Sequence, residues 1–452
     1  MRRFVIAMLG LGLLAVLLAG CEMFTPRDAL VSMSASAGKD FILAFQGDKV
    51  PAHVRELVSA AGGEVKTILD EIGAVVATAR AGEFATKAAT IKGVTAVIPD
   101  VKVNFLVDET REAAFEDEGA TGGDEPYFGL QWGLRAIDAH GAWDAGYTGA
   151  GVRVAVLDTG IDVDHRDLAP NLNVALSRSF DPDEPTIDDF NGHGSNVAGI
   201  VAAADNAWGV IGVAPQAEIV AVKVLDGSGS GDFSWLLEGI LYAVSIDADV
   251  INMSLGAYLP HRGFVADDGT WVGANEVAGF VNLVKKIANY AIQQGGLVVS
   301  TAGNLSIDMT GDQGLLHVPA DCGEGLMVSA TGPLGVRQNP NTNLDVPATY
   351  TNYGMNVDFA APGGNYDPTI PDYRYDFVRN CYWNGGFVWM AGTSQAAPHV
   401  SGIAALIIER YNHSLTPSQI EAVLRQSADD LGKPGRDPYY GQGRVNAAQA
   451  VR

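Results

Sequence analysis

Four polar side chains of different chemical types lie beside glycine or other small residues in this 452-residue sequence. They are Asp158 in VAVLDTGID, His193 in FNGHGSNVAG, Asn304 in LVVSTAGN and Ser394 in AGTSQAAPHVSG. A serine becomes a nucleophile when an imidazole accepts its proton and a carboxylate holds that imidazole in one tautomer. An amide N–H can stabilise the oxyanion that the attack creates. Together, the four residue types supply the groups that acyl transfer needs.

Each of the four residues also has a structural interpretation when it is taken alone. Asp158 ends an apolar run, where an aspartate commonly caps a turn, and Ser394 precedes a helical pattern, where serine is a preferred N-cap. Asparagine after glycine, as at Asn304, is common in turns. A lone histidine such as His193 is more often a satisfied core or capping residue. Only the set of four, with its flanking residues, indicates chemistry.

Alternating strand and helix patterns predict how distant residues are brought together. In residues 127–452 the runs GVRVAVLD, EIVAVKVL, VINMSLG and LVVSTAGN are apolar on both faces, and helical patterns such as HGSNVAGIVAAA and SWLLEGILYAVSI separate them. Such strands form an α/β fold with a doubly wound, mostly parallel sheet, whose sites lie at the carboxyl ends of the strands. Asp158 and Asn304 follow two of these strands.

The first 126 residues predict four further parts. Residues 1–20 carry Arg2 and Arg3 followed by an apolar run, which is the layout of a signal peptide, and residues 21–36 form a small, polar tether. Residues 37–106 alternate short strand and helix patterns and predict a small α+β domain. Residues 107–126 are acidic and contain few large apolar side chains. We expect them to form an exposed, protease-sensitive linker.

Charge and cysteine content limit the classes of partner. The chain has 53 acidic and 29 basic residues, a formal net charge of −24, which argues against binding to nucleic acid or anionic lipid headgroups and permits cation binding. Apart from Cys21, only Cys322 and Cys381 are present. The two form a possible disulfide that would close a long loop, and two free buried thiols are the alternative.

Asp158, His193, Asn304 and Ser394, in this order and with these flanks, resemble the motifs of the subtilisin family of serine proteases, the subtilases. The resemblance covers the chain from about residue 127 to its end and includes GVAPQAEIVAVKVL, INMSLG and YGQGRVNAAQAV. It implies a subtilisin-like fold and a serine endopeptidase that works through an acyl-enzyme. In that reaction Ser394 is the nucleophile, His193 the general base and then acid, and Asp158 the orienting carboxylate. Asn304 and the backbone N–H of Ser394 form the oxyanion hole.

The resemblance also implies how protein or peptide substrates are held. Ser254, Leu255 and Gly256 pair with the substrate backbone as an extended strand. Ala302 and Gly303 form the opposite wall of the pocket for the side chain before the cut bond. Residues 37–106 resemble the family's inhibitory propeptide, so we expect a zymogen with its maturation site in residues 107–126.

A calcium site follows from the same resemblance. DNAWGVIGVAP matches the family's calcium loop, and a solvated acidic rim without an ion is the alternative. The implied structural Ca²⁺ has oxygen ligands from Asn206, the carbonyls of Ala204, Trp208 and Val210, and the carboxylates of Asp167 and Glu125.

The end of the apolar run, LAGC, resembles a bacterial lipobox with lipidation at Cys21. An ordinary signal or anchor helix is the alternative. We therefore expect an exported monomer that is anchored to a membrane through lipid, or released after propeptide removal.

The sequence departs from the family pattern near both catalytic residues. Where the family usually has HGTHVAG, this chain has HGSNVAG, with Ser195 and Asn196 replacing threonine and histidine. Gln395 replaces the usual methionine after the nucleophile. These positions supply packing and supporting hydrogen bonds, so we expect His193 to be functional.

Two other functions are alternatives to the protease. An α/β-hydrolase esterase needs serine before aspartate before histidine and a G-x-S-x-G turn, and GTSQA fails that test. The remaining alternative is a catalytically inactive surface binding protein with a subtilase fold.

Overall fold

The computed structural model describes residues 38–452 except positions 81, 107–109, 114–124 and 312–313. The predicted signal peptide, the tether after it, Cys21 and most of the predicted linker lie outside the described residues. Lys39–Arg452 form one unit. Among the helices that the structure describes, none combines the length and the apolar character needed to cross a membrane.

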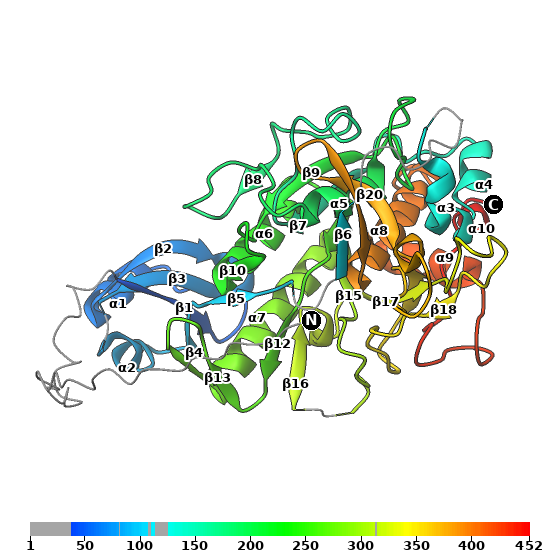
Figure 1. Cartoon of the computed structure of the whole chain (residues 1–452). Helices are drawn as coiled ribbons and strands as arrows, with labels where there is room; N and C mark the ends of the chain where they lie inside the picture. The colour runs from blue at the N-terminus through cyan, green and yellow to red at the C-terminus, as the bar shows by residue number, and fades with distance from the viewer. Residues whose placement is uncertain (1–37, 81, 107–109, 114–124, 312–313) are drawn as a thin grey trace, which may run out of the picture. The chain divides into compact units, whose positions relative to one another are not determined.

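A mostly parallel sheet forms the centre of the larger part of the chain, as predicted (Figure 1). Its strand order is β18-β17-β15-β11-β7-β9-β8, and β19 also pairs with β17. Only the β17–β18 pairing is antiparallel. The strands are β7 (Arg153–Asp158), β8 (Arg178–Ser179), β9 (Glu218–Lys223), β11 (Val250–Met253), β15 (Leu297–Thr301), β17 (Leu326–Gly332), β18 (Val346–Pro347) and β19 (Phe359–Pro362).

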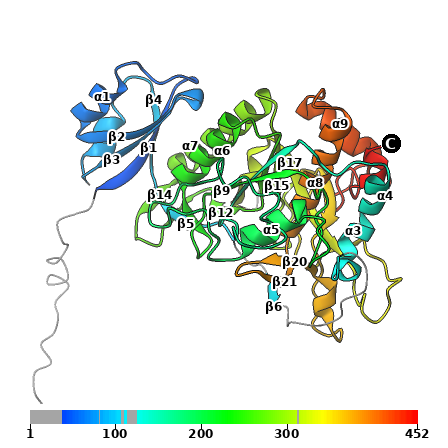
Figure 2. The ribbon, with the colours of Figure 1, turned by 90° about the horizontal axis from the view of Figure 1, so that it is seen from above.

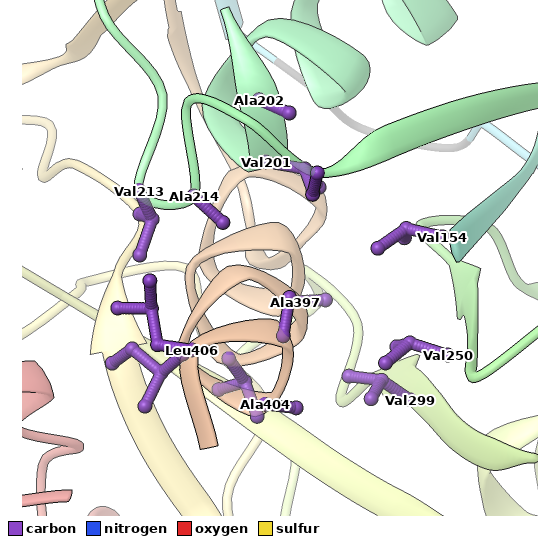
Figure 3. Packing of buried hydrophobic residues seen from close by; sticks show 14 of the residues in the cluster. Val154, Val201, Ala202, Val213, Ala214, Val250, Val299, Ala397, Ala404 and Leu406 are labelled. Atoms are coloured by element: carbon purple, nitrogen blue, oxygen red, sulfur yellow. The ribbon is translucent and has the colours of Figure 1, made fainter. Parts of the chain in front are cut away.

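Helices cover both faces of this sheet because its strands alternate apolar side chains between two cores. Val154 and Val156 of β7 pack in the core that includes α5 (His193–Ala202) and α8 (Thr393–Arg410). Ala155 and Leu157 pack in the core that includes α6 (Phe233–Ser245) and α7 (Ala274–Gln293). Figure 3 shows Ala397 and Ala404 of α8 facing Val250 and Val299 of the sheet. The described residues of 127–452 also form four shorter α-helices: α3 (Trp132–Ala136), α4 (Ala139–Asp144), α9 (Pro417–Ser427) and α10 (Ala447–Ala450).

The two cysteines of this part do not pair. Both are free and buried, Cys381 in the core with α5 and α8 and Cys322 in the core with α6 and α7. Since the sheet lies between them, the possible disulfide is wrong and the alternative of two buried thiols holds.

Residues 39–99 form the predicted small α+β fold. Its antiparallel sheet has the order β2-β3-β1-β4, made of β1 (Lys39–Phe45), β2 (Gly63–Leu69), β3 (Ala74–Ala79) and β4 (Val94–Pro99). One face packs on α1 (Val54–Ala61) and α2 (Phe84–Ala88). The other face packs on α7, which lies beside the sheet in Figures 1 and 2.

Two segments differ from the sequence prediction. The run TAVIPDVKVNF, predicted as one strand, breaks after Pro99, and β5 (Lys102–Asn104) pairs instead with β10 (Ser230–Asp232). Within the predicted linker, β6 (Thr110–Ala113) pairs with β21 (Gly386–Ala391), which also pairs with β20 (Val378–Tyr382). The linker is therefore not irregular throughout.

The remaining described strands form two antiparallel pairs near the carboxyl edge of the central sheet. One joins β12 (Ala257–Pro260) to β16 (Leu315–Val318), and the other joins β13 (Gly263–Val265) to β14 (Trp271–Gly273). The first pair forms part of the pocket described below.

Candidate active site

A buried carboxylate–imidazole pair lies at the carboxyl edge of the central sheet. Asp158 is the last residue of β7 and His193 is the first residue of α5. His193 Nδ1 lies 2.6 Å from Asp158 Oδ1, which also accepts a hydrogen bond from the Thr159 N–H at 2.8 Å. Burial raises the pKa of Asp158, and the neighbouring His193 opposes that rise. With Nδ1 directed at the carboxylate, Nε2 is the ring nitrogen that can take a proton from a substrate or nucleophile.

Two glycines allow His193 to occupy this position. Gly192 has a left-handed φ of 94°, and a Cβ there would lie 2.1 Å from the Tyr382 ring. A Cβ at Gly194 would lie 2.1 Å from the Gly160 carbonyl oxygen. A side chain at either position would therefore clash with these neighbours and disturb the segment that places the imidazole.

Asp189 organises the loop before His193, and the sequence analysis did not identify it. Its Oδ1 accepts from the Thr159 hydroxyl at 2.8 Å and from the Gly192 N–H at 2.8 Å. Its Oδ2 accepts from the N–H and the hydroxyl of Ser195, at 2.9 and 2.7 Å. Ser195 Oγ in turn accepts from the Asp162 N–H. The Ser195 hydroxyl thus both donates and accepts a hydrogen bond at the position where the family pattern has threonine.

Ser394 is the second residue of α8 and is held against the end of β11. Its Oγ donates to the Ser254 carbonyl at 3.1 Å, and Ser254 Oγ donates to the Ser394 carbonyl at 2.8 Å. Asn252 Nδ2 donates to Ser254 Oγ at 3.0 Å. Because Ser394 lies at a helix N-terminus, the helix dipole favours negative charge developing beside it.

Asn304 follows β15 and has a fixed amide orientation. Its Oδ1 accepts from both the N–H and the hydroxyl of Thr393, each at 2.9 Å. Since the carbonyl end of the amide is bound beside Ser394, Nδ2 is the end that remains to donate. This is the orientation that an oxyanion donor requires.

The chain's own residues 102–106 lie along the edge of this site. The Gly256 N–H donates to the Phe105 carbonyl at 2.9 Å, and the Phe105 N–H donates to the Gly229 carbonyl at 3.0 Å. Leu106 forms a β-bridge with Gly256. An extended peptide thus already lies against one of the segments that the sequence analysis assigned to substrate binding, in which Leu255 is buried.

A small cavity adjoins Ser394 and Gly256. Gly303 and Asn304 line it, together with Tyr258 and His317, which the sequence analysis did not identify. Ala302, predicted as part of this wall, is instead turned into a buried cluster with Ala320, Met327 and Val357. Its carbonyl accepts a hydrogen bond from Asn352 Nδ2 at 2.8 Å.

Comparison with known proteins identifies the family. Residues 149–443 match the model of the subtilase family (peptidase S8). This chain belongs to the subtilase family. It is 36% identical over 323 residues to M-protease of Shouchella clausii strain KSM-K16, an alignment that covers 72% of this chain and 70% of that protein. The identity to subtilisin Savinase of Lederbergia lenta is also 36%, covering 72% of this chain and 99% of that protein.

One further relative and two solved structures extend the similarity of this subtilase. Subtilisin NAT of Bacillus subtilis subsp. natto is 31% identical over 444 residues, 97% of each chain. The epidermin leader peptide processing serine protease of Staphylococcus aureus has a TM-score of 0.73 at 23% identity, covering 92% of this chain and 98% of that chain, which shows the fold. A lanthipeptide protease has a TM-score of 0.58 at 29% identity, covering 71% of this chain and 93% of that chain. The protein is a subtilisin-like serine protease.

Two of the three departures of this subtilase from the family motifs, Asn196 and Gln395, contact each other. Gln395 Nε2 donates to Asn196 Oδ1 at 3.2 Å, and Asn196 Nδ2 donates to the Cys381 carbonyl at 3.1 Å. Both side chains are buried. The residue after Ser394 is therefore tied to the helix that begins with His193. A pair of amides replaces the histidine and methionine that the family pattern has at these positions.

The predicted calcium loop of the subtilase buries two carboxylates side by side. Asp167 accepts from the Val210 N–H at 3.0 Å and from Asn206 Nδ2 at 3.1 Å. Glu125 Oε1 accepts from the N–H groups of Asn206 and Ala207, at 2.6 and 2.7 Å. Burial raises the pKa of Asp167 to about 7 and also raises the pKa of Glu125.

Two side-chain oxygens at this loop form no hydrogen bond with the described residues. Within the part of the chain that the structure describes, Glu125 Oε2 and Asn206 Oδ1 are buried without a hydrogen-bond partner. Ala204, Trp208 and Val210 belong to the same loop. With two buried carboxylates and two unpartnered oxygens, the donor set fits a hard cation such as Ca²⁺. Since both carboxylates are buried, the loop is not a solvated acidic rim.

We predict that Asn196 and Gln395 act as a coupled pair. Asn196→His or Gln395→Met alone leaves a buried amide without its partner, at a cost of about 1–3 kcal/mol. Each single variant should therefore lose stability and kcat/KM. The double variant, which restores the family's own pair, should recover most of both, with a coupling energy of about 1–3 kcal/mol. Melting temperature and peptide hydrolysis measure the two effects, and strictly additive losses would contradict the coupling.

Proposed function

We propose that this subtilase is an endopeptidase, made as a zymogen, that cuts peptide bonds with Asp158, His193 and Ser394. The observation that supports the proposal most directly is the 2.6 Å contact between His193 Nδ1 and Asp158 Oδ1. It holds the imidazole at the start of α5, and Ser394 lies in the first turn of α8, which packs against α5. The alternative, an inactive binding protein, has no need of a buried carboxylate in that contact.

The hydrogen bonds of Asp158, His193 and Asn304 support the following reaction. Ser394 Oγ attacks the substrate carbonyl while His193 Nε2 takes its proton, and Asp158 stabilises the resulting imidazolium. Asn304 Nδ2 and the Ser394 N–H donate to the oxyanion. His193 then gives the proton to the leaving amine, and a water molecule repeats the sequence on the acyl-enzyme. For attack, the Ser394 hydroxyl must turn from the Ser254 carbonyl to the imidazole.

A fluorophosphonate probe tests this function. It should label the wild-type protein and fail to label Ser394→Ala, because the probe reacts with an activated serine hydroxyl. Asn304→Ala should lower kcat about 10²- to 10³-fold with a smaller change in KM, since its amide acts on the transition state; that magnitude is the one known for subtilisin. Absence of labelling in the matured wild-type protein would favour the binding-protein alternative.

Residues 37–106 act in this proposal as an inhibitory propeptide. Three contacts support that role. The β1–β4 sheet covers α7, β5 pairs with β10, and Phe105 and Leu106 lie against Gly256. While these residues remain there, a substrate cannot pair with the same backbone groups. Cleavage within residues 107–126 would separate the propeptide covalently from the protease.

A group of carboxylates lies where this propeptide meets α6. Asp100 Oδ1 accepts from the Ser234 N–H in the first turn of α6 at 2.9 Å. Loss of water around Asp100, together with the nearby charges of Asp232 and Asp40, raises its pKa to about 7, although its hydrogen bonds to Ser234 oppose the rise. Burial also raises the pKa of Asp232, which Lys102 and Lys66 oppose. Docking of the propeptide therefore favours a protonated Asp100.

We predict that the docked, uncut form loses stability as pH rises. A carboxyl whose pKa is higher in the folded state gives its full contribution below the unfolded value, near 4. That contribution falls as pH rises from about 4 to about 7. In the Ser394→Ala background, Asp100→Asn should remove this part of the pH dependence. Calorimetric melting temperatures between pH 4 and 8 measure it, with Asp164→Asn as an exposed control. Parallel curves for Asp100→Asn and its parent would contradict the prediction.

The calcium loop is proposed to hold a structural ion. Glu125, Asp167, Asn206 and the carbonyls of Ala204, Trp208 and Val210 would bind Ca²⁺, whose charge offsets the two buried carboxylates. Its role is to stabilise the loop, and no catalytic step depends on it.

We predict that calcium stabilises the protein against heat. Calcium at about 100 times its Kd should add about 2.7 kcal/mol to the free energy of unfolding, and EGTA should remove it. Asn206→Ala, which deletes an unpartnered oxygen, should lower the melting temperature in calcium and shrink the difference that EGTA makes. An unchanged melting temperature of the wild-type protein in EGTA would contradict the site.

We further propose that the protein is exported and tethered by lipid at Cys21, with residues 1–20 as the signal peptide. The support is the sequence LAGC after an apolar run. Because the proposed maturation site follows the propeptide, cutting there would release a monomeric protease from its covalent anchor. Membrane fractionation, with an antibody to the C-terminus, should find uncut chain in the membrane and matured chain in the soluble fraction. Cys21→Ser should release the uncut chain as well.

A further inference from the structure

The cavity beside Ser394 is closed by a histidine ring. His317 lies in β16 and is 2% exposed. A Cβ placed on Gly256 would lie 2.1 Å from His317 Nε2, and one placed on Gly303 would lie 3.1 Å from the same atom. Gly256 and Gly303 belong to the two segments between which the side chain before the cut bond is expected to enter. The imidazole therefore fills the space between the two walls.

Tyr258 keeps this ring in place. It is the register partner of His317 in the β12–β16 pair, and the two ring centroids are 4.6 Å apart. The Tyr258 hydroxyl accepts from the Asn304 N–H at 2.9 Å and from Asn352 Nδ2 at 3.0 Å. A Cβ on Gly303 would lie 2.3 Å from that hydroxyl. Tyrosine and histidine thus form one rigid floor under the cavity.

Little room remains above this floor. The cavity, whose lining also includes Leu106 and Ser394, has a volume of about 10 Å³, enough for one water molecule. Phe105 and Leu106 of the proposed propeptide also line the cavity, and Leu106 packs against Gly229, where a Cβ would lie 2.9 Å from Leu106 Cδ1. The residues that separate Gly256 from Gly303, His317 and Tyr258, belong to the protease itself and remain when the propeptide leaves.

The floor carries no charge that would attract a charged side chain. The His317 ring donates to the Thr301 carbonyl, and burial lowers its pKa to about 4, so the imidazole is neutral at neutral pH. Its Nδ1 has no hydrogen-bond partner among the described residues. A neutral ring offers neither the cation that an acidic side chain needs nor an anion for a basic one.

Resting on the proposed function, we infer that this protease cuts after glycine, alanine or serine, and that His317 and Tyr258 determine this specificity. A methyl or hydroxymethyl group can enter above the floor. A phenyl ring or a leucine side chain would need the space that the imidazole occupies. His317 is a specificity-determining residue and takes no part in the chemistry.

Peptide p-nitroanilides that differ only in the last residue test this inference on the secreted, matured protein. The wild-type enzyme should prefer alanine to phenylalanine by about 100-fold or more in kcat/KM, since a side chain that does not fit loses its binding in the transition state. His317→Gly should raise the phenylalanine-to-alanine ratio at least about 10-fold by opening the cavity. Leu315→Gly, in the same strand but outside the cavity lining, should leave the ratio unchanged.

The outcomes separate this inference from the proposed function. Serine-dependent cleavage by the wild-type enzyme after phenylalanine as fast as after alanine would overturn the inference alone. No cleavage of any substrate, with no fluorophosphonate labelling of Ser394, would overturn the proposed function and the inference with it. Should His317→Gly fail to fold, mass spectrometry of a protein digest made by the wild-type enzyme still decides. Cuts after large apolar residues would overturn the inference, and cuts after small residues would support it.

Discussion

Close packing of two buried helices is the constraint on which the rest of this structure depends. α5 and α8 both begin at the carboxyl edge of the sheet, and α8 is buried from Thr393 to Ile408. A glycine in each helix also lets that helix pack closely against the segments around it. A Cβ on Gly199 would lie 2.1 Å from Asn380 Oδ1, and one on Gly402 would lie 2.6 Å from the Val213 Cβ. Because the two helices are buried and closely packed, their first turns hold His193 and Ser394 at one edge of the sheet without any flexible connection.

Burial determines the behaviour of the charged groups as well. At Asp158 the loss of water is offset by an imidazole and a backbone N–H, so a carboxylate can remain beside His193. At Asp167 the loss of water outweighs the opposing charge of Arg166, and among the described residues Glu125 Oε2 and Asn206 Oδ1 have no hydrogen-bond partner, which favours a metal ion. Asp100 lies near further carboxylates, so protonation is what lowers the free-energy cost of removing it from water.

The sequence predicted those parts that depend on local patterns. Apolar runs and helical spacing were enough for the parallel sheet and its covering helices, and the flanks of Asp158, His193, Asn304 and Ser394 were enough for the family. Features that arise from contacts between distant segments could not be read in this way. Gln395 reaches Asn196 across 199 positions, and His317 becomes a pocket residue only because β16 pairs with β12. The same holds for β5, whose partner β10 lies more than one hundred residues away and breaks the strand predicted through Pro99.

The placement of the two thiols on opposite sides of the central sheet has a consequence for how the protein can be produced. Burial raises the pKa of Cys322 to about 12 and holds that of Cys381 well above its usual value, so neither readily forms the thiolate that oxidants and alkylating reagents attack. No covalent crosslink between them holds residues 127–452 together. Their folding therefore needs no oxidase or disulfide isomerase, and a reducing cytoplasm and an oxidising periplasm are equivalent surroundings for it.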